Sequence, residues 1–266
     1  MQNKKYWIWL SKIDLNPEKI KKCLEKYTPE DIWNLKEETN KFFTKEEINK
    51  IKNINYRKDL ELHEQYLLKH KIELITIKDK EYPEKLKQID NPPICLYVLG
   101  NKQILGQKSI AIVGSRGCSD YGKTVSQAFS YLLAKNNIVV VSGLAKGIDG
   151  AAHIGTLQAK GKTIAVIGTG IDLVYPKENK DLMEQIVENG GTIISEYPLG
   201  TKPDKQNFPR RNRIIAGLSD GVLVIEAREK SGALITVDYA LEQGKNIYAV
   251  PRKYYKQNVK TELMNC

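Results

Sequence analysis

The sequence predicts an α/β fold: a Rossmann-like, doubly wound and mainly parallel sheet behind a small helical N-terminal domain. From residue 109 onward, short apolar runs alternate with amphipathic stretches whose apolar residues recur at helical spacing. The runs are rich in Val and Ile without polar alternation, which is typical of strands covered on both faces. Six of them are present, at residues 109–114, 138–143, 163–170, 192–197, 221–227 and 246–251. Strands that alternate with helical crossovers form a doubly wound parallel sheet.

The N-terminal part of the chain has a different character. Residues 1–71 are rich in Lys and Glu, contain no glycine and are periodic at helical spacing, so we expect a small helical domain. Its helices are predicted at residues 7–13, 17–26, 29–35 and 45–69. Thr28 and Thr44 precede acidic first turns, as helix N-caps do. The aromatic residues of this domain are expected to form its core, although a nucleobase could also stack on them: Trp7, Trp9, Trp33, Phe42 and Phe43.

Residues 72–107 differ from both neighbouring regions. They carry two strand-like runs, ELITI and ICLYVLG, separated by turns that contain proline. We expect this segment to be an extended connection that packs on the next domain. Residues 108–251 then form the Rossmann-like domain, and residues 252–266 form a C-terminal tail.

Composition favours a polyanionic partner. The chain has 42 basic and 32 acidic residues, a net charge of +10 and a pI near 9.2, which suit a nucleic acid or an anionic membrane surface. Its four cysteines lie far apart with no CxxC pair, which argues against a zinc site and a disulfide framework and favours a reducing cytoplasm. No apolar stretch is long enough for a signal peptide or a membrane span, so no membrane association is expected.

Arginine is concentrated in one segment. Only seven arginines occur in the chain, and Arg210, Arg211 and Arg213 fall within NFPRRNRIIAGLS at residues 207–219. Apolar residues follow at helical spacing, so the arginines lie near the start of a predicted helix. Guanidinium groups beside the free N–H groups of a helix start suit a phosphate ligand. Alternatively, some of them pair with a nearby carboxylate and fasten the loop. Three carboxylates could do so: Asp204, Asp220 and Glu226.

The turns that follow the predicted strands carry most of the other candidate residues. Ligands of a doubly wound sheet bind outside the carboxyl ends of the strands. Glycines there let backbone N–H groups approach a ligand closely, and the adjoining helix starts favour negative charge. The turns in question contain Gly114, Ser115, Arg116 and Gly117; Ser142, Gly143 and residues 145–149; residues 168–170; Glu196; and residues 231–233.

Several familiar cofactor motifs are missing from the sequence. No GxGxxG follows the first strand and no acidic residue ends the second, which disfavours a dinucleotide cofactor. No GxxxxGK[ST] motif supports ATP hydrolysis, and we expect no cofactor. Asp149 and His153 lie four residues apart and could form an acid–base pair. We favour a structural role instead, in which Asp149 braces the glycine-rich turn and His153 supports it.

Six motifs resemble one known family. They are AIVGSR (111–116), VSGLAKGIDGAAH (141–153), IAVIGTGIDLVYP (164–176), SEYPLG (195–200), NFPRRNRIIAGLSDGVLVIEA (207–227) and SGALIT (231–236). In this order they resemble the DNA-processing protein A family, also called DprA or Smf, over about residues 72–251. The helical N-terminal domain resembles the helix-hairpin-helix or SAM-like domain of many members in general character.

The resemblance implies a function and a site. It implies a cytoplasmic bacterial protein that binds single-stranded DNA without catalysing a reaction on it. It also implies a homodimer formed through the Rossmann-like domain, protection of incoming DNA, and loading of RecA during natural transformation. Matching the family's motifs position by position gives the expected DNA-binding residues: Gly114, Ser115, Arg116, Ser142, Gly143, Lys205, Phe208, Arg211, Asn212, Arg213, Ser231 and Gly232.

The C-terminal residues depart from the family pattern. Members continue after the AVP strand with a glycine and an Asn-x-Leu-Ile segment, and many add a winged-helix domain. Here the sequence reads AVPRKYYKQNVKTELMNC. We therefore expect residues 252–266 to be a divergent or truncated tail.

An enzymatic alternative also stays open from the sequence. The chain could be a nucleoside-phosphate-binding protein or a phosphoribohydrolase related to the lysine-decarboxylase-like family, with Glu196 or Asp149 as the general acid or base. Those enzymes carry a PGGxGTxxE motif. The corresponding stretch here, SGALITVDYA, lacks the paired glycines and the glutamate.

Overall fold

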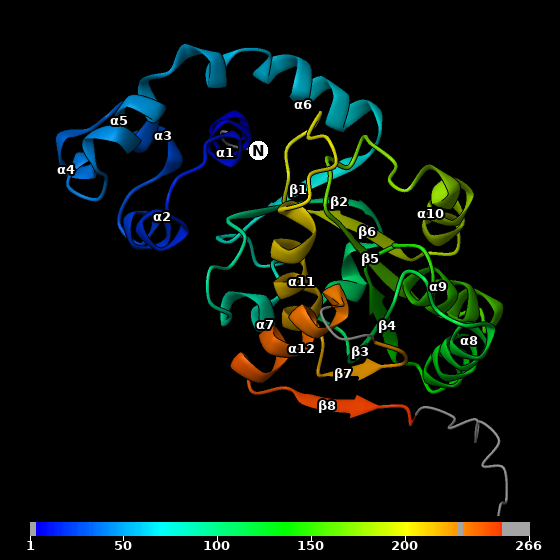
Figure 1. The fold of residues 1–266 in the computed structure, drawn as a ribbon. Helices are drawn as coiled ribbons and strands as arrows, with labels where there is room; N and C mark the ends of the chain where they lie inside the picture. The colour runs from blue at the N-terminus through cyan, green and yellow to red at the C-terminus, as the bar shows by residue number, and fades with distance from the viewer. Residues whose placement is uncertain (1–3, 228–230, 252–266) are drawn as a thin grey trace, which may run out of the picture.

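The computed structural model describes residues 4–227 and 231–251, which form a helical N-terminal unit beside a three-layered α/β domain (Figure 1). The predicted C-terminal tail, residues 252–266, lies outside the described residues. Within the two described ranges, no helix combines the length and the apolar composition that crossing a bilayer requires.

Three helices of the N-terminal unit begin at the predicted residues 17, 29 and 45, whereas the first begins at Lys4 instead of residue 7. Thr28 accepts a hydrogen bond from the backbone N–H of Asp31, whose carboxylate accepts one from the backbone of Thr28. Thr44 and Glu47 form the same reciprocal pair. Each pair satisfies two N–H groups that a helix start leaves without partners. The helical elements are α1 (Lys4–Lys12), α2 (Pro17–Leu24), α3 (Pro29–Trp33), α4 (Glu37–Asn40), α5 (Lys45–Lys52), η1 (Ile54–Arg57) and α6 (Leu60–Lys69).

The prediction of one helix over residues 45–69 is wrong. The segment is divided into α5, η1 and α6. Asn53 has an extended backbone, with ψ at 113°, and its side chain accepts from the backbone N–H of Asn55. Asp59 is left-handed, with φ at 60°. Short polar side chains such as these compete with the helix for backbone groups.

Aromatic side chains form the core of the helical unit, as the sequence predicts. Trp9 is fully buried, and its ring centroid lies 5.2 Å from that of Trp33 in an edge-to-face arrangement. The guanidinium of Arg57 covers Trp33 with its carbon 4.1 Å from the ring centroid. Phe43 is also buried, whereas Trp7 and Phe42 are partly buried against the same cluster. These contacts occupy the aromatic surfaces on which a nucleobase would otherwise stack.

A single eight-stranded sheet spans the second domain in the order β1-β2-β6-β5-β4-β3-β7-β8. All six predicted strands are present and each pairs in parallel with its neighbour among the six. The segment predicted as an extended connection supplies β1 and β2, which extend the sheet as antiparallel edge strands next to β6. The strands are β1 (Ile72–Thr76), β2 (Cys95–Gly100), β3 (Ser109–Val113), β4 (Val139–Ser142), β5 (Thr163–Ile167), β6 (Thr192–Ser195), β7 (Gly221–Val224) and β8 (Asn246–Ala249).

Helices cover both faces of this sheet. Alternate residues of β3 point to opposite faces of the sheet. Ile112 packs with residues of α9 on one face, and Ala111 and Val113 pack with residues of α11 on the other. One layer holds α8 (Asp120–Lys135), α9 (Ile148–Gln158) and α10 (Lys180–Glu188), preceded by η3 (Lys177–Asn179). The other holds α7 (Glu84–Lys87), α11 (Asn207–Leu218) and α12 (Gly232–Glu242), and η2 (Lys102–Gly106) joins β2 to β3.

The strand order reverses between β3 and β7. The strands β3, β4, β5 and β6 follow one another outward in one direction, and β7 and β8 lie on the other side of β3. Val113 at the end of β3 is paired with Val224 at the end of β7, so the loops that follow these strands diverge from neighbouring points. Such a reversal opens a crevice at the carboxyl edge of a parallel sheet.

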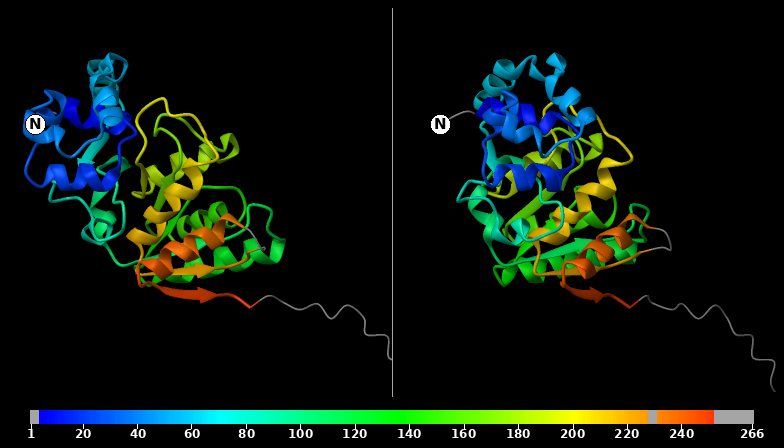
Figure 2. Two further views of the ribbon diagram at one scale, coloured as in Figure 1. Left: turned by 60° about the vertical axis from the view of Figure 1, so that its left-hand side comes forward. Right: turned by 90° about the vertical axis from the view of Figure 1, so that its left-hand side faces the viewer.

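The helical unit lies against the β1–β2 side of the sheet (Figure 2). Its buried residues belong to one apolar cluster with Tyr97 of β2 and Ile193 of β6. The hydroxyl of Ser11 in α1 hydrogen-bonds that of Tyr97 at 2.9 Å. The two parts therefore share a hydrophobic core.

Candidate nucleic-acid interface

A pocket of about 590 Å³ lies at the point where the strand order reverses. Its walls come from the turn after β3, the start of α11 and the start of α12. The predicted residues that line it are Gly114, Ser115, Arg116, Lys205, Phe208, Arg211, Asn212, Ser231 and Gly232. The fold thus gathers predicted residues from distant parts of the sequence at one edge of the sheet.

Cationic and aromatic groups meet in this pocket. The guanidinium carbon of Arg116 lies 5.2 Å from the ring centroid of Phe208. The ring of Tyr175 lies 5.4 Å from the same centroid, with the two planes tilted by 34°. Lys205 is exposed on the wall of the pocket. The pocket therefore presents positive charge beside aromatic surface, the combination on which unpaired nucleotides bind.

The turn that carries Arg116 is fixed by its neighbours. The backbone N–H of Ser115 donates to the carbonyl of Glu226, just after β7, at 2.7 Å. The carboxylate of Glu226 accepts from the backbone N–H and the hydroxyl of Ser119, at 3.1 and 2.8 Å. Gly147 has φ at 79°, and a Cβ there would collide with the carbonyl oxygen of Ser115. Only glycine allows this approach, which holds the turn from a third side.

Arg211 is a buried part of the pocket floor. It is 4% exposed, and its Nη1 donates to the carbonyl of Gly143 at 2.8 Å and to that of Val166. Burial lowers the pKa of Arg211 to about 10, an effect that the nearby Asp149 carboxylate opposes. Burial raises the pKa of Asp149, and Arg211 opposes that shift in turn. Arg211 therefore fastens the ends of β4 and β5 to α11 while remaining charged at neutral pH.

Ser142 and Gly143 lie beneath the pocket and do not line it. Ser142 is 0% exposed, and its hydroxyl donates to the carbonyl of Ile112 at 2.7 Å. The N–H of Gly143 donates to Asp149 at 3.1 Å, and its carbonyl accepts from Arg211. These polar groups are engaged within the protein, so Ser142 and Gly143 support the pocket, and Gly143 also lines a smaller cavity beside it.

Asn212, Ser231 and Gly232 join α11 to α12 on the opposite wall. The Asn212 amide donates to the carbonyl of Gly232 at 3.0 Å. The Ser231 hydroxyl accepts from the backbone N–H of Ala233 at 3.1 Å and so caps α12. All three line the pocket as predicted.

Arg213 does not reach this pocket, which corrects the prediction from the sequence. Its Nη1 donates to the carboxylate of Glu196 at 2.7 Å and its Nε donates to the carbonyl of Asn91 at 2.9 Å. Residues two apart on an α-helix point about 200° apart, so Arg211 and Arg213 face opposite sides of α11. The alternative in which an arginine fastens the loop holds for Arg213. The partner of Arg213 is Glu196, which was not among the carboxylates proposed from the sequence. Of those, Asp220 forms an ion pair with Lys85 at 2.6 Å.

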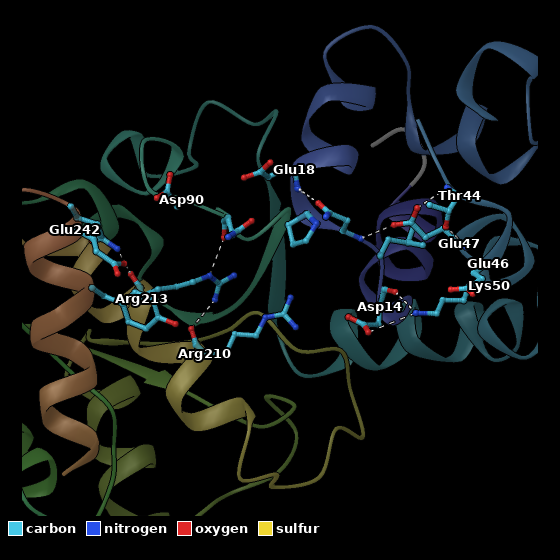
Figure 3. Close-up of a pocket in the computed structure, with 16 residues that line it drawn as sticks. Asp14, Glu18, Thr44, Glu46, Glu47, Lys50, Asp90, Arg210, Arg213 and Glu242 are labelled. Carbon is cyan, nitrogen blue, oxygen red and sulfur yellow. Dashed lines mark hydrogen bonds and ion pairs between the residues drawn. The ribbon is translucent and has the colours of Figure 1, made fainter. Parts of the chain in front are cut away.

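Arg213 instead faces a second pocket of about 900 Å³ between the helical unit and the α11–α12 layer. Figure 3 shows Arg210 and Arg213 on one side of it and Asp14 and Lys50 of the helical unit on the other. Carboxylates outnumber cations on its walls. A polyanion would be repelled from these carboxylates, so the Arg116 pocket is the better candidate for a nucleic-acid site.

Comparison with known proteins identifies the family. The family model described as DNA recombination-mediator protein A matches residues 73–264. The chain belongs to this family. Over 177 residues it is 50% identical to the DNA processing protein DprA of Streptococcus pneumoniae, a match that covers 66% of this chain and 62% of that one. Over 203 residues it is 46% identical to the protein Smf of Synechocystis, covering 75% and 50%. The chain thus spans about half to three-fifths of the length of these DprA and Smf relatives.

Solved DprA structures have the same fold. The X-ray structure of DprA from Streptococcus pneumoniae matches with a TM-score of 0.74 and 39% identity, over 96% of this chain and 89% of that one. A structure of DNA processing protein A from Helicobacter pylori, described by its single-stranded DNA binding mode, matches with a TM-score of 0.63 and 31% identity. That match covers 69% of this chain and 83% of the other.

In this DprA family member, three residues of the site were given no DNA-binding role from the sequence. Tyr175 extends the aromatic wall, Lys146 adds a cation at the turn after β4, and Glu226 braces the Arg116 turn. Each lies within one of the quoted motifs, but motif matching did not assign a role to it. For Tyr175 the available signal was an aromatic residue in the loop after β5, at the carboxyl edge where ligands bind.

Asp149 and His153 are fixed in structural hydrogen bonds. The hydroxyl of Thr163 donates to the carbonyl of Val140 at 2.7 Å, so Nδ1 of His153 must donate to Thr163, at 2.8 Å. Among the described residues, Nε2 of His153 has no partner. Burial, and then the positive charge of Arg211, lower the pKa of His153 to about 3. The described residues also contain no cluster of three or more His, Cys, Asp or Glu side chains suited to a metal ion.

We expect the buried neutral His153 to make this DprA family member sensitive to acid. Its pKa is lowered from 6.5 to about 3 in the folded chain, so the unfolded chain binds more protons below pH 6.5. The contribution of His153 to the free energy of unfolding is therefore fully present above pH 6.5 and is lost as the pH falls toward 3. Between pH 7 and pH 5 the loss amounts to about 2 kcal/mol.

The measurement is urea unfolding of the wild type and of His153→Gln at several pH values. Other titrating groups contribute equally to both proteins, so their difference isolates His153. The stability advantage of the wild type should shrink by about 2 kcal/mol from pH 7 to pH 5. A difference that stays constant over this range would show that His153 is not held neutral.

Proposed function

We propose that this chain is a single-stranded DNA-binding recombination mediator that protects incoming DNA and loads RecA during natural transformation. It acts in the cytoplasm as a homodimer and binds DNA without catalysing a reaction on it. The observation that carries the proposal is the convergence of Arg116, Lys205 and Phe208 on one pocket. Two further findings support it: membership of the recombination-mediator family, and the likeness to the Helicobacter pylori protein, whose structure is described by its single-stranded DNA binding mode.

The chemistry of the pocket favours an unpaired strand over a duplex. Arg116 and Lys205 supply charge for phosphates, and Phe208 offers a ring to a base. A base in a duplex is already stacked and paired, so its face is not available to a ring. A volume of about 590 Å³ lies within the usual range for a small-molecule-sized ligand such as a nucleotide.

The contacts of the two candidate acid–base residues favour binding over hydrolysis. Glu196 is engaged by Arg213, and Asp149 is buried and accepts from the backbone of Gly143. Glu196 does not line the Arg116 pocket, and the carboxylate of Asp149, which does line it, is held by the N–H of Gly143. For the homodimer, support comes from the exposed apolar side chains Leu241 and Tyr248 on α12 and β8, at the outer edge of the sheet.

The test is a titration of fluorescently labelled oligo-dT and of a duplex of equal length at several salt concentrations. We expect at least tenfold tighter binding of oligo-dT. We also expect the logarithm of the association constant to fall linearly with the logarithm of the salt concentration. The slope should be about −1.4 or steeper, since each of two cations contributes about −0.7 on a single strand. Equal affinity for the duplex, or no salt dependence, would contradict the proposal. Tighter binding of a mononucleotide than of oligo-dT would favour the nucleoside-phosphate alternative.

A further inference from the structure

A second, smaller cavity adjoins the proposed DNA pocket. Its volume is about 60 Å³, and it shares the side chains of Arg116, Tyr175 and Phe208 with the main pocket. Lys146, which does not line the main pocket, lies on its wall, and Gly143 and Gly168 bring backbone close to it. We call this space the annex.

Positive charge dominates the annex. Arg116, Lys146 and Arg211 reach it from the turn after β3, the turn after β4 and helix α11. Among the described residues, no carboxylate lines it. Three cations around a small space with no acidic side chain suit a compact, highly charged anion such as phosphate.

The size of the annex selects a phosphate group over a whole nucleotide. A volume of about 60 Å³ exceeds the roughly 10–15 Å³ that one water needs, so several non-hydrogen atoms fit. Pockets for whole small molecules begin at roughly 300 Å³. The main pocket, at about 590 Å³, is large enough for base and sugar. The two spaces therefore match the alternation of nucleoside and phosphate along a strand.

The Lys146 ammonium has a replaceable partner. It lies 2.5 Å from the carboxylate of Glu178, and the two side chains are 56% and 64% exposed. Exposed ion pairs of this kind contribute little net stability because both groups are well solvated. A phosphate in the annex can therefore displace Glu178 from Lys146 at small cost.

We propose that the annex binds the backbone phosphate next to the nucleotide in the main pocket, with Lys146 as its ligand and Glu178 as its competitor. This inference rests on the proposed function, because it assumes a strand in the main pocket. Arg211 contributes its charge from the floor, and Tyr175 closes the aromatic wall between the two spaces.

Titration of labelled oligo-dT against a set of surface variants tests the annex. Lys146→Ala should weaken binding about five- to tenfold at 0.1 M salt and make the salt slope less negative by about 0.7, the value for one lost phosphate contact. Lys146→Arg should retain most of the affinity. Glu178→Gln should strengthen binding two- to threefold, roughly, because the competitor is removed.

The double variant and a matched control separate a local contact from general electrostatics. The double variant Lys146→Ala/Glu178→Gln should bind oligo-dT with the same affinity as Lys146→Ala alone, because Glu178 then has no lysine for which to compete. Glu184→Gln removes the same charge from an exposed pair, with Lys180 at 3.8 Å, and should have no effect. If Glu178→Gln strengthens binding equally with and without Lys146, the assignment of Lys146 is overturned.

The outcomes also distinguish the annex from the proposed function. If Arg116→Ala weakens binding while Lys146→Ala preserves both affinity and salt slope, the annex is refuted and the DNA pocket stands. If the wild type shows no preference for oligo-dT, the proposed function fails and the annex fails with it. A weakened Lys146→Ala variant with an unchanged salt slope would also overturn the annex, because a lost phosphate contact must change that slope.

Discussion

Replacing Phe208 with alanine should weaken binding of oligo-dT by about 1–3 kcal/mol, or roughly 5- to 150-fold, the measured range for loss of one stacked base. The ring of Phe208 lines the pocket, and its centroid lies 5.2 Å from the guanidinium carbon of Arg116 and 5.4 Å from the ring centroid of Tyr175. Alanine removes the face on which a base stacks and the surface that positions Arg116. No charge is lost, so the salt slope should stay close to that of the wild type.

A matched control is available on the outer layer of the domain. Phe129 on α8 is 41% exposed and does not line the DNA pocket. Phe129→Ala should leave affinity unchanged, and Phe208→Trp should preserve most of it because the aromatic face is kept. An oligonucleotide carrying 2-aminopurine gives an independent measurement, since stacking quenches its fluorescence. Equal losses from both alanine variants, or quenching that survives Phe208→Ala, would contradict a stacking role for Phe208.

The parallel sheet could be predicted because its signal is local. Runs such as IVVVS and TIAVI are apolar on both faces, and only a strand between two helical layers needs that pattern. Once the strands and crossovers are placed, the carboxyl ends of parallel strands must share one edge. This is why Arg116 and Phe208, far apart in the sequence, could be expected to lie together.

Strand pairing at the edge of the sheet needed information that the sequence does not carry locally. The runs of β1 and β2 carry no local signal that shows which strand they join. Their place is set by the antiparallel pairing of Tyr97 with Ser195, across about a hundred residues of chain. The helical division at Asn53 and Asp59 had a local signal, but the continuous charge pattern around it concealed the break.

Side-chain direction explains what the site prediction missed. Motif matching treats Arg211 and Arg213 alike, whereas helical geometry directs them to opposite sides of α11. Ser142 ends a strand with its side chain on the buried face, where its hydroxyl bonds β3. Both errors arise because a motif records which residues occur together. It does not record whether each side chain points toward the ligand or away from it.

Arg211 provides the second large expected effect, and it concerns stability. Arg211→Ala should lower the free energy of unfolding by about 3–5 kcal/mol, the usual cost of leaving a buried charge without a compensating one. The carbonyls of Gly143 and Val166 lose their donor, and the buried Asp149 loses the positive charge that opposes its raised pKa. Arg210→Ala, at an exposed neighbouring position, should change stability by less than about 0.5 kcal/mol.

Urea unfolding followed by circular dichroism is the suitable measurement. Tryptophan fluorescence alone would follow the helical unit, because all three tryptophans, Trp7, Trp9 and Trp33, lie there. Adding Asp149→Asn to Arg211→Ala should recover part of the loss, since the uncompensated carboxylate is then neutral.

The same variants decide which role Arg211 has in DNA binding. Family resemblance alone makes Arg211 a DNA contact, and a contact residue can be removed with little change in stability but a smaller salt slope. The buried hydrogen bonds make it a support for the β4 and β5 turns, whose loss reduces stability first and weakens binding through a displaced Phe208 on the same helix. We expect the second result. A stable Arg211→Ala protein with a reduced salt slope would instead show that the guanidinium leaves its carbonyl partners to bind phosphate.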